Sequence, residues 1–152
     1  MKPLPHQYEV DLTGGPSGCA LTSAHNVPAL CVEPPLEFDG PGDRWSPEHL
    51  LLAAVEACFV LTFRGRARHA QVPFESLQVH ATGTVDRLQG VTRFTEIVLH
   101  VRVTTDRESD RDRIKDVLDK SERTCLVAAS LSTPVRLVPE VVVRSGCAGR
   151  AA

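Results

Sequence analysis

The chain lacks an excess of charge of either sign. Its formal net charge is −2, and its 14 Arg and 3 Lys are scattered along the 152 residues rather than clustered. A basic patch is the electrostatic feature by which proteins bind nucleic acids and acidic membrane surfaces. The charge balance therefore gives no case for a nucleic-acid or membrane partner.

The chain also lacks a long apolar run, a visible signal peptide and internal repeats. A membrane helix needs about 20 apolar residues, whereas the most apolar stretch, within 50–63, is shorter and contains Glu56. Polar residues follow the first six positions, where a signal peptide would be apolar. We therefore expect a cytoplasmic protein with one domain over residues 1–152, whose tail, 144–152, is loose.

The five cysteines follow no metal-binding pattern. None stands in a CxxC pair, and no histidine lies at zinc-site spacing from a cysteine, so neither a metal nor a disulfide framework is expected. We interpret Cys19 and Cys31 as small strand residues without a redox role, and Cys147 as incidental in the tail. The thiols of Cys58 and Cys125 are the candidates for chemistry.

Periodicity in the sequence predicts a mixed α+β fold. Alternating apolar and polar residues indicate strands, and apolar residues at helical spacing indicate helices. The element order is βββ-α-ββ-αα-β, with antiparallel sheets around a central buried helix. In chain order, we expect strands at 6–13, 19–24 and 29–33, a helix from Pro47 to about Ala70, a hairpin at 77–85 and 91–104, helices at 106–123 and 124–131, and a strand at 134–143.

The predicted long helix dominates the sequence. Ser46 is placed to cap it, Pro47 suits its first turn, and Glu48 complements its dipole. From 50 to 63 only Glu56 and Thr62 are polar, so the helix is expected to be buried in a core or against a partner subunit. Its one thiol, Cys58, is either a small packed hydrophobe or a nucleophile.

Two cysteine motifs now resemble a known family. The pattern S-P-E-x-L-L-x-A-A-x-x-A-C-F, from Ser46 to Phe59, resembles the first cysteine motif of the OsmC/Ohr family. The run from Glu122 to Leu131 is similar to the second motif, and the turn from Thr13 to Gly18 is similar to the first glycine turn. The resemblance implies an intertwined homodimer, with the buried helices of two subunits at its centre and active sites at the subunit interface.

The resemblance also implies an activity. Family members reduce organic hydroperoxides with a helix cysteine as the attacking nucleophile and a second cysteine that resolves the intermediate. Here these would be Cys58 and Cys125, with an external dithiol such as dihydrolipoamide as reductant and no bound cofactor or metal. Phe59 and Phe63 would either line the substrate pocket or belong to the core.

Ionisation of the attacking thiol needs help from its surroundings. Burial raises the pKa of a thiol, and Cys58 is expected three turns inside its helix, where the dipole has faded. From the sequence, Cys58 is therefore a poor thiolate unless a cation lies beside it. Cys125, near the start of a short helix, is better placed with respect to the helix dipole.

The chain departs from the family at one position. Ohr-type peroxidases carry an arginine in the first glycine turn, where this chain has Pro16. Glu48 matches the family carboxylate that pairs with this arginine, although an acid in a first turn is also ordinary. Arg44 is the nearest substitute in sequence, and Arg64 and Arg123 are further candidates. The departure keeps an alternative open, a non-catalytic OsmC-like dimer that binds a small molecule or senses redox state through its thiols.

Overall fold

The computed structural model describes residues 2–144 of the chain. These residues form two compact units, which divide between Leu51 and Leu52. Cys147 and most of the predicted loose tail lie outside the described residues. Arg144, the first residue of that predicted tail, is held in place, because its backbone N–H donates to the Thr105 carbonyl at 2.8 Å and its guanidinium pairs with Glu75 at 2.7 Å.

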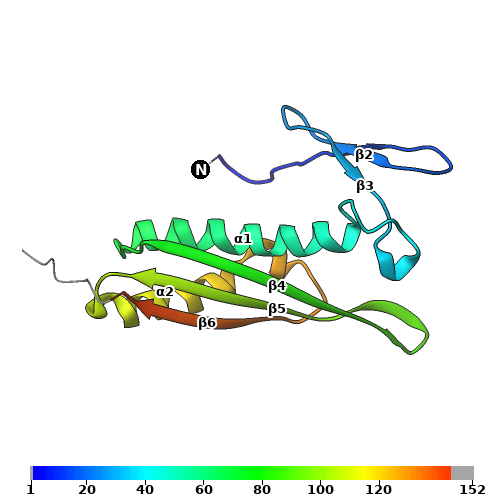
Figure 1. Cartoon of the computed structure of the whole chain (residues 1–152). Helices are drawn as coiled ribbons and strands as arrows, with labels where there is room; N and C mark the ends of the chain where they lie inside the picture. Colours follow the sequence, from blue (N-terminus) through cyan, green and yellow to red (C-terminus); the bar gives the residue numbers. More distant parts are fainter. Residues whose placement is uncertain (1, 145–152) are drawn as a thin grey trace, which may run out of the picture. The chain divides into compact units, whose positions relative to one another are not determined.

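The first unit is built on a small antiparallel meander, as predicted. Strands β1 (Asp11–Thr13), β2 (Ala20–Ser23) and β3 (Leu30–Val32) pair in that order, and the 3-10 turn η1 (Leu36–Phe38) follows them (Figure 1). The first strand is shorter than the predicted 6–13. The side chains of Tyr8 and Val10 are 89% and 76% exposed, so no burial holds the start of the predicted strand in place.

Helix α1 (Pro47–His69) begins and ends where the sequence predicts. The buried Ser46 hydroxyl accepts a hydrogen bond from the backbone N–H of His49 at 3.3 Å, which satisfies one of the free donors of the first turn. At the other end Gln71 takes a left-handed conformation with φ of 52°, which stops the helix before Pro73.

The second unit contains a three-stranded sheet, which corrects one prediction. Strands β4 (Ser76–Leu88) and β5 (Val91–Thr105) form the expected antiparallel hairpin, but β6 (Val135–Val143) pairs with β5 in parallel. The prediction of purely antiparallel sheets was wrong because the helices after β5 carry the chain back to the end of the sheet where β5 begins. Such a crossover makes the next strand parallel.

The crossover consists of η2 (Glu108–Asp110), α2 (Arg111–Thr124) and α3 (Leu126–Ala129). Figure 1 shows α1 running along the sheet of β4, β5 and β6. Alternate residues of β5 and single apolar stripes of α1 and α2 form one core. Its buried members include Val55, Phe59, Phe63, Ala67, Ile97, Leu99, Val101, Val103, Ile114, Val117 and Leu118.

Within a single chain, α1 is buried along one stripe only. Its buried residues recur every four positions, whereas Leu61 is 65% exposed. The expectation of a helix covered on nearly every side is therefore not met by this chain alone. No helix among residues 2–144 is both long and apolar enough to cross a membrane.

The core position of Phe63 generates a stability prediction. Phe63 is fully buried and meets the ring of Phe74 edge-on, with ring centroids 5.2 Å apart. We expect Phe63→Ala to lower the free energy of unfolding by about 3–5 kcal/mol, because it removes a large apolar contact and leaves a cavity. Urea titration followed by circular dichroism measures the change. The matched change Val91→Ala, at a side chain 58% exposed, should cost under ~0.5 kcal/mol; equal losses would contradict the described core.

Candidate functional site

The structure brings together the two cysteines that the sequence singles out, Cys58 and Cys125. Cys58 lies in α1 and is partly exposed, and Cys125 is a buried core residue between α2 and α3. The two thiols lie close enough for each to shift the pKa of the other. The backbone N–H of Val127 points at the sulfur of Cys58, with the nitrogen 3.5 Å from Sγ.

A break in the helical crossover places Cys125. Its backbone is extended, with φ of −66° and ψ of 112°, so it ends α2 and begins α3. Its carbonyl accepts the first hydrogen bond of α3, from the Ala129 N–H at 2.9 Å. The free N–H groups at the start of α3 are therefore available to a neighbour, and the sulfur of Cys58 occupies that place.

Hydrogen bonds favour the ionised form of Cys58. Burial opposes ionisation, but donors from the Val127 backbone, the Cys125 thiol, the Leu126 backbone and the Thr62 side chain outweigh it and lower the pKa of Cys58. No positively charged group is among these causes. The prediction that Cys58 is a poor thiolate without a cation is wrong, because backbone donors from a distant segment replace the cation.

Cys125 shows the opposite behaviour. Burial raises its pKa, and the hydrogen bond and negative charge of Cys58 raise it further, against backbone donors from Ala128 and Val127. Backbone donors at the start of α3 do act on Cys125, as its place in the sequence predicts, but burial and the neighbouring Cys58 outweigh them. The pair thus holds one thiol poised to ionise and one that stays protonated.

The surroundings of Cys125 are tightly packed. The cavity that it borders, with Phe59 and Leu99 among its walls, has a volume of about 20 Å³, enough for about one water molecule. Phe63 lies fully buried in the core. Of the two alternatives for Phe63, pocket wall or core, the structure places it in the core.

The two supporting residues, Glu48 and Arg44, belong to the first unit. Within residues 2–144, Oε2 of Glu48 is buried without a hydrogen-bond partner, as expected if its family partner is replaced by Pro16. Arg44 lies 3.9 Å from Asp43 in an exposed ion pair and lines an open hollow with Trp45 and His49. A role for either residue beside Cys58 stays a prediction.

Sequence reasoning missed one cation near the cysteine pair. Arg66, two turns after Cys58 on α1, donates from Nε and Nη2 to the Thr124 hydroxyl at 2.9 and 2.8 Å. Thr124 directly precedes Cys125, so this guanidinium ties α1 to the segment that carries the second thiol. Residues two helical turns apart lie on the same side of a helix, so the sequence could have indicated that Arg66 lies on the same side of α1 as Cys58. The side chains of the two arginines that the sequence suggested on these helices, Arg64 and Arg123, are exposed.

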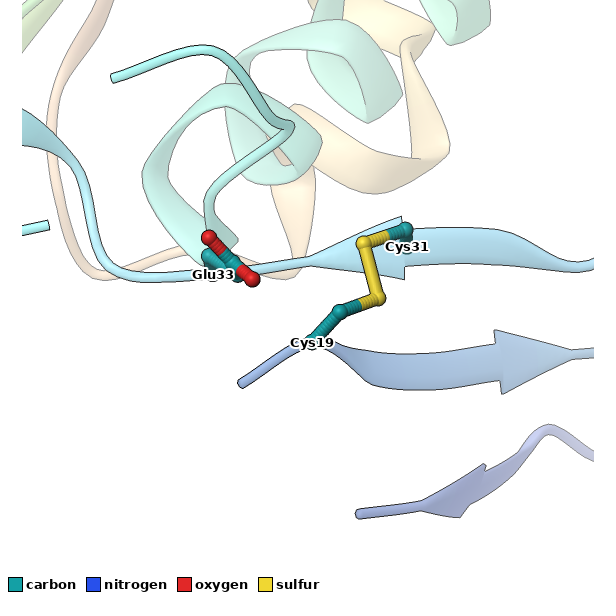
Figure 2. Close-up of side chains that lie close together, drawn as sticks. All are labelled: Cys19, Cys31 and Glu33. Atoms are coloured by element: carbon teal, nitrogen blue, oxygen red, sulfur yellow. A yellow bond between two sulfur atoms is a disulfide. The ribbon is translucent and has the colours of Figure 1, made fainter. Parts of the chain in front are cut away.

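A second cysteine pair corrects another prediction. Cys19 and Cys31 form a disulfide in the first unit, with Cα atoms 5.6 Å apart (Figure 2). The interpretation of these two cysteines as small unpaired strand residues, in a chain without a disulfide framework, was wrong. Antiparallel pairing of Leu21 with Cys31 puts the two cysteines on one face of adjacent strands. The strands were predicted, but the register that joins the sulfurs was not considered.

Comparisons with known proteins agree with this architecture. Residues 40–140 match the family described as OsmC-like protein. A protein of Bacillus subtilis, the uncharacterised YmaD, is 26% identical over 115 residues, covering 74% of this chain and 77% of YmaD.

Solved structures share the fold at lower identity. An OsmC-like protein of unknown function from Vibrio cholerae superposes with a TM-score of 0.80 at 17% identity, over 91% of this chain and all (100%) of that one. An organic hydroperoxide resistance protein from Elizabethkingia anophelis gives a TM-score of 0.73 at 21% identity, over 95% and 100% of the two chains. Since the family match spans more than half of the sequence, the chain belongs to the OsmC-like protein family.

Proposed function

We propose that the chain is a thiol-dependent peroxidase that reduces organic hydroperoxides, with Cys58 as the attacking thiolate and Cys125 as the resolving thiol. The observation that carries this proposal is the contact of two thiols whose pKa values are shifted in opposite directions. A lowered pKa and partial exposure suit the nucleophile, and a buried neighbour with a raised pKa suits the resolving thiol. Family membership supports the same chemistry, because the fold recurs in organic hydroperoxide resistance proteins.

The proposed catalytic cycle has three steps. The Cys58 thiolate attacks the outer oxygen of the hydroperoxide and breaks the O–O bond; with one proton taken up, an alcohol leaves and Cys58 becomes a sulfenic acid. The Cys125 thiol then attacks the Cys58 sulfur and releases water as a disulfide forms. An external dithiol reduces this disulfide by two exchange steps and leaves as its own cyclic disulfide. No metal or bound cofactor takes part.

Homodimer formation is part of the proposal, and the exposed face of α1 supports it. Ala54, Ala57 and Leu61 are exposed at helical spacing, and a Cβ added to Gly65 would meet nothing within 4 Å. A face of small apolar residues lets another helix approach closely and lose exposed apolar surface. Packing against α1 of a second copy would cover this exposed face, as the sequence predicts for this helix. The second chain would then also cover the exposed side of Cys58.

One observation favours a second function. The carboxylate oxygen Oε2 of Glu48 is buried without a partner among residues 2–144, and Pro16 stands in place of the family arginine. A protein without that arginine could bind a small molecule or act as a thiol sensor. A sensor would consume one equivalent of hydroperoxide and stop, whereas a peroxidase turns over as long as dithiol is present.

The proposed roles predict distinct effects of the two cysteines. We expect Cys58→Ser to abolish hydroperoxide consumption with dihydrolipoamide, because serine cannot form a sulfenic acid. Cys125→Ser should consume about one equivalent and then accumulate sulfinic acid at Cys58, since no thiol resolves the intermediate. Coupled consumption assays and intact-mass measurements test this. Cys147→Ser serves as the thiol-loss control and should match the parent; equal turnover by Cys58→Ser and the parent would exclude the assignment.

The opposed pKa shifts predict a pH dependence. The lowered pKa of Cys58 keeps it ionised at pH values where Cys125 is still protonated. Alkylation of the reduced protein by iodoacetamide should therefore label Cys58 first, and its rate should fall only as the pH drops through the lowered pKa. Peptide mapping at a series of pH values separates the two sites. Faster labelling of Cys125 at neutral pH would contradict the described hydrogen bonds.

The proposed interface predicts that one exposed residue controls assembly. Leu61→Glu should shift the protein from dimer to monomer, because it places a charge where two apolar helices would meet. Sedimentation velocity over a range of concentrations measures the shift. Val91→Glu, at another exposed apolar position, is the matched control and should leave the dimer intact. A parent protein that is monomeric at every concentration would overturn this part of the proposal.

A further inference from the structure

Three side chains with metal-binding atoms converge on one face of the N-terminal sheet. The register pairs Ala20 with Val32 and Leu21 with Cys31, which brings Cys19 opposite Glu33 on the same face as Cys31. One ligand atom from each of Cys19, Cys31 and Glu33 lies within 4.8 Å of the others. Figure 2 shows the Glu33 side chain beside the two sulfurs.

The Glu33 carboxylate is free to bind. Among residues 2–144 it makes no hydrogen bond or ion pair, although the backbone N–H of the same residue donates to the Trp45 carbonyl at 2.9 Å. The adjacent Val32 also forms a β-bridge with Trp45. The backbone at Glu33 is therefore held by Trp45, while the carboxylate has no partner among residues 2–144 and can bind a cation.

The donor set suits zinc. Thiolate sulfur and carboxylate oxygen are both zinc ligands, at about 2.3 Å and about 2.0–2.2 Å from the ion. Tetrahedral geometry with these bond lengths separates two sulfurs by about 3.8 Å, so the sulfurs of Cys19 and Cys31 must move apart once their bond is reduced, while one carboxylate oxygen of Glu33 already lies within 4.8 Å of both. Three protein ligands leave a fourth position for water. Hard cations such as Mg²⁺ are disfavoured, because they prefer oxygen ligands alone.

We propose that Cys19, Cys31 and Glu33 form a redox-gated zinc site, in which the disulfide is the metal-free state. A dithiol reductant cleaves the S–S bond by exchange, yielding two cysteine thiols and the oxidised reductant. Binding one Zn²⁺ then displaces both thiol protons and leaves a Zn–S₂O centre. Since a sulfur bonded to the other cysteine is no longer a thiolate, disulfide formation and zinc binding exclude one another.

The surface beside the pair provides access for a reductant or an ion. Cys31 lines an open hollow of about 560 Å³, together with Asp43, Arg44 and His49. All three proposed ligands are partly exposed. This site does not involve Cys58 or Cys125, so it stands or falls separately from the proposed peroxidase chemistry.

Binding of Zn²⁺ and Co²⁺ to the untagged full chain tests the proposal. The background variant carries Cys58→Ser, Cys125→Ser and Cys147→Ser, so that only the proposed site offers thiols. After reduction with dithiothreitol and its removal under argon, we expect one Zn²⁺ per chain in competition with a chromophoric chelator. Co²⁺ should give thiolate-to-metal charge-transfer absorption and the visible bands of a tetrahedral ion. Oxidation to the disulfide should abolish both signals.

Single substitutions in the same background assign the ligands. Cys19→Ser and Cys31→Ser should each remove the charge-transfer absorption of one thiolate and weaken Zn²⁺ binding by at least ~100-fold, more than the loss of an outer-shell partner costs. Glu33→Gln retains both thiols and the ability to form the disulfide, but should weaken Zn²⁺ binding by at least ~10-fold. Glu37→Gln, an exposed acid in the same unit, is the control. Circular dichroism verifies that each variant is folded. Zinc binding that survives oxidation to the disulfide, or an affinity for Zn²⁺ that is unchanged in Cys19→Ser or Glu33→Gln, overturns the proposal.

Discussion

The contact between the sulfur of Cys58 and the backbone of Val127 is the interaction on which the candidate site depends. An α-helix offers its interior residues no free N–H group, so a thiol in the middle of α1 gains nothing from its own helix. The donors come instead from α3, about seventy residues later, whose first N–H groups have no carbonyl partner within the helix. Burial alone would suppress the thiolate, and these donors reverse that effect.

The fold holds this contact in place through the core that α1, α2 and β5 share. The buried stripe of α1 fixes the rotation of the helix, and therefore the direction in which Cys58 points. Cys125 is itself part of the core, so the break between α2 and α3 cannot drift away from the helix. Arg66 adds a polar tie from α1 to Thr124 on the other side of the break. The two thiols are thus positioned by packing and hydrogen bonding within the chain itself.

Much of this architecture could be predicted from the sequence. The cap at Ser46, the long helix and the hairpin follow local rules of capping and periodicity, and their boundaries agree closely with the structure. The pairing of Cys58 with Cys125 came from family motifs rather than from local rules. The parallel direction of β6 and the Cys19–Cys31 bond depend on how distant segments pair, which periodicity does not specify. The ionisation of Cys58 was mispredicted for the same reason, since its donors come from a different helix.

The central claim is that the contact between Cys58 and Cys125 is chemically productive. Its most direct test is peptide mapping. The protein is first treated so that the thiols of Cys58 and Cys125 are reduced, then given one equivalent of cumene hydroperoxide and quenched rapidly with acid. The account predicts a new disulfide joining the peptides of Cys58 and Cys125, with the Cys58 sulfenic acid trapped in its place when dimedone is present. An unmodified Cys58 thiol, with the hydroperoxide left intact or its oxidation found at other cysteines, would contradict it.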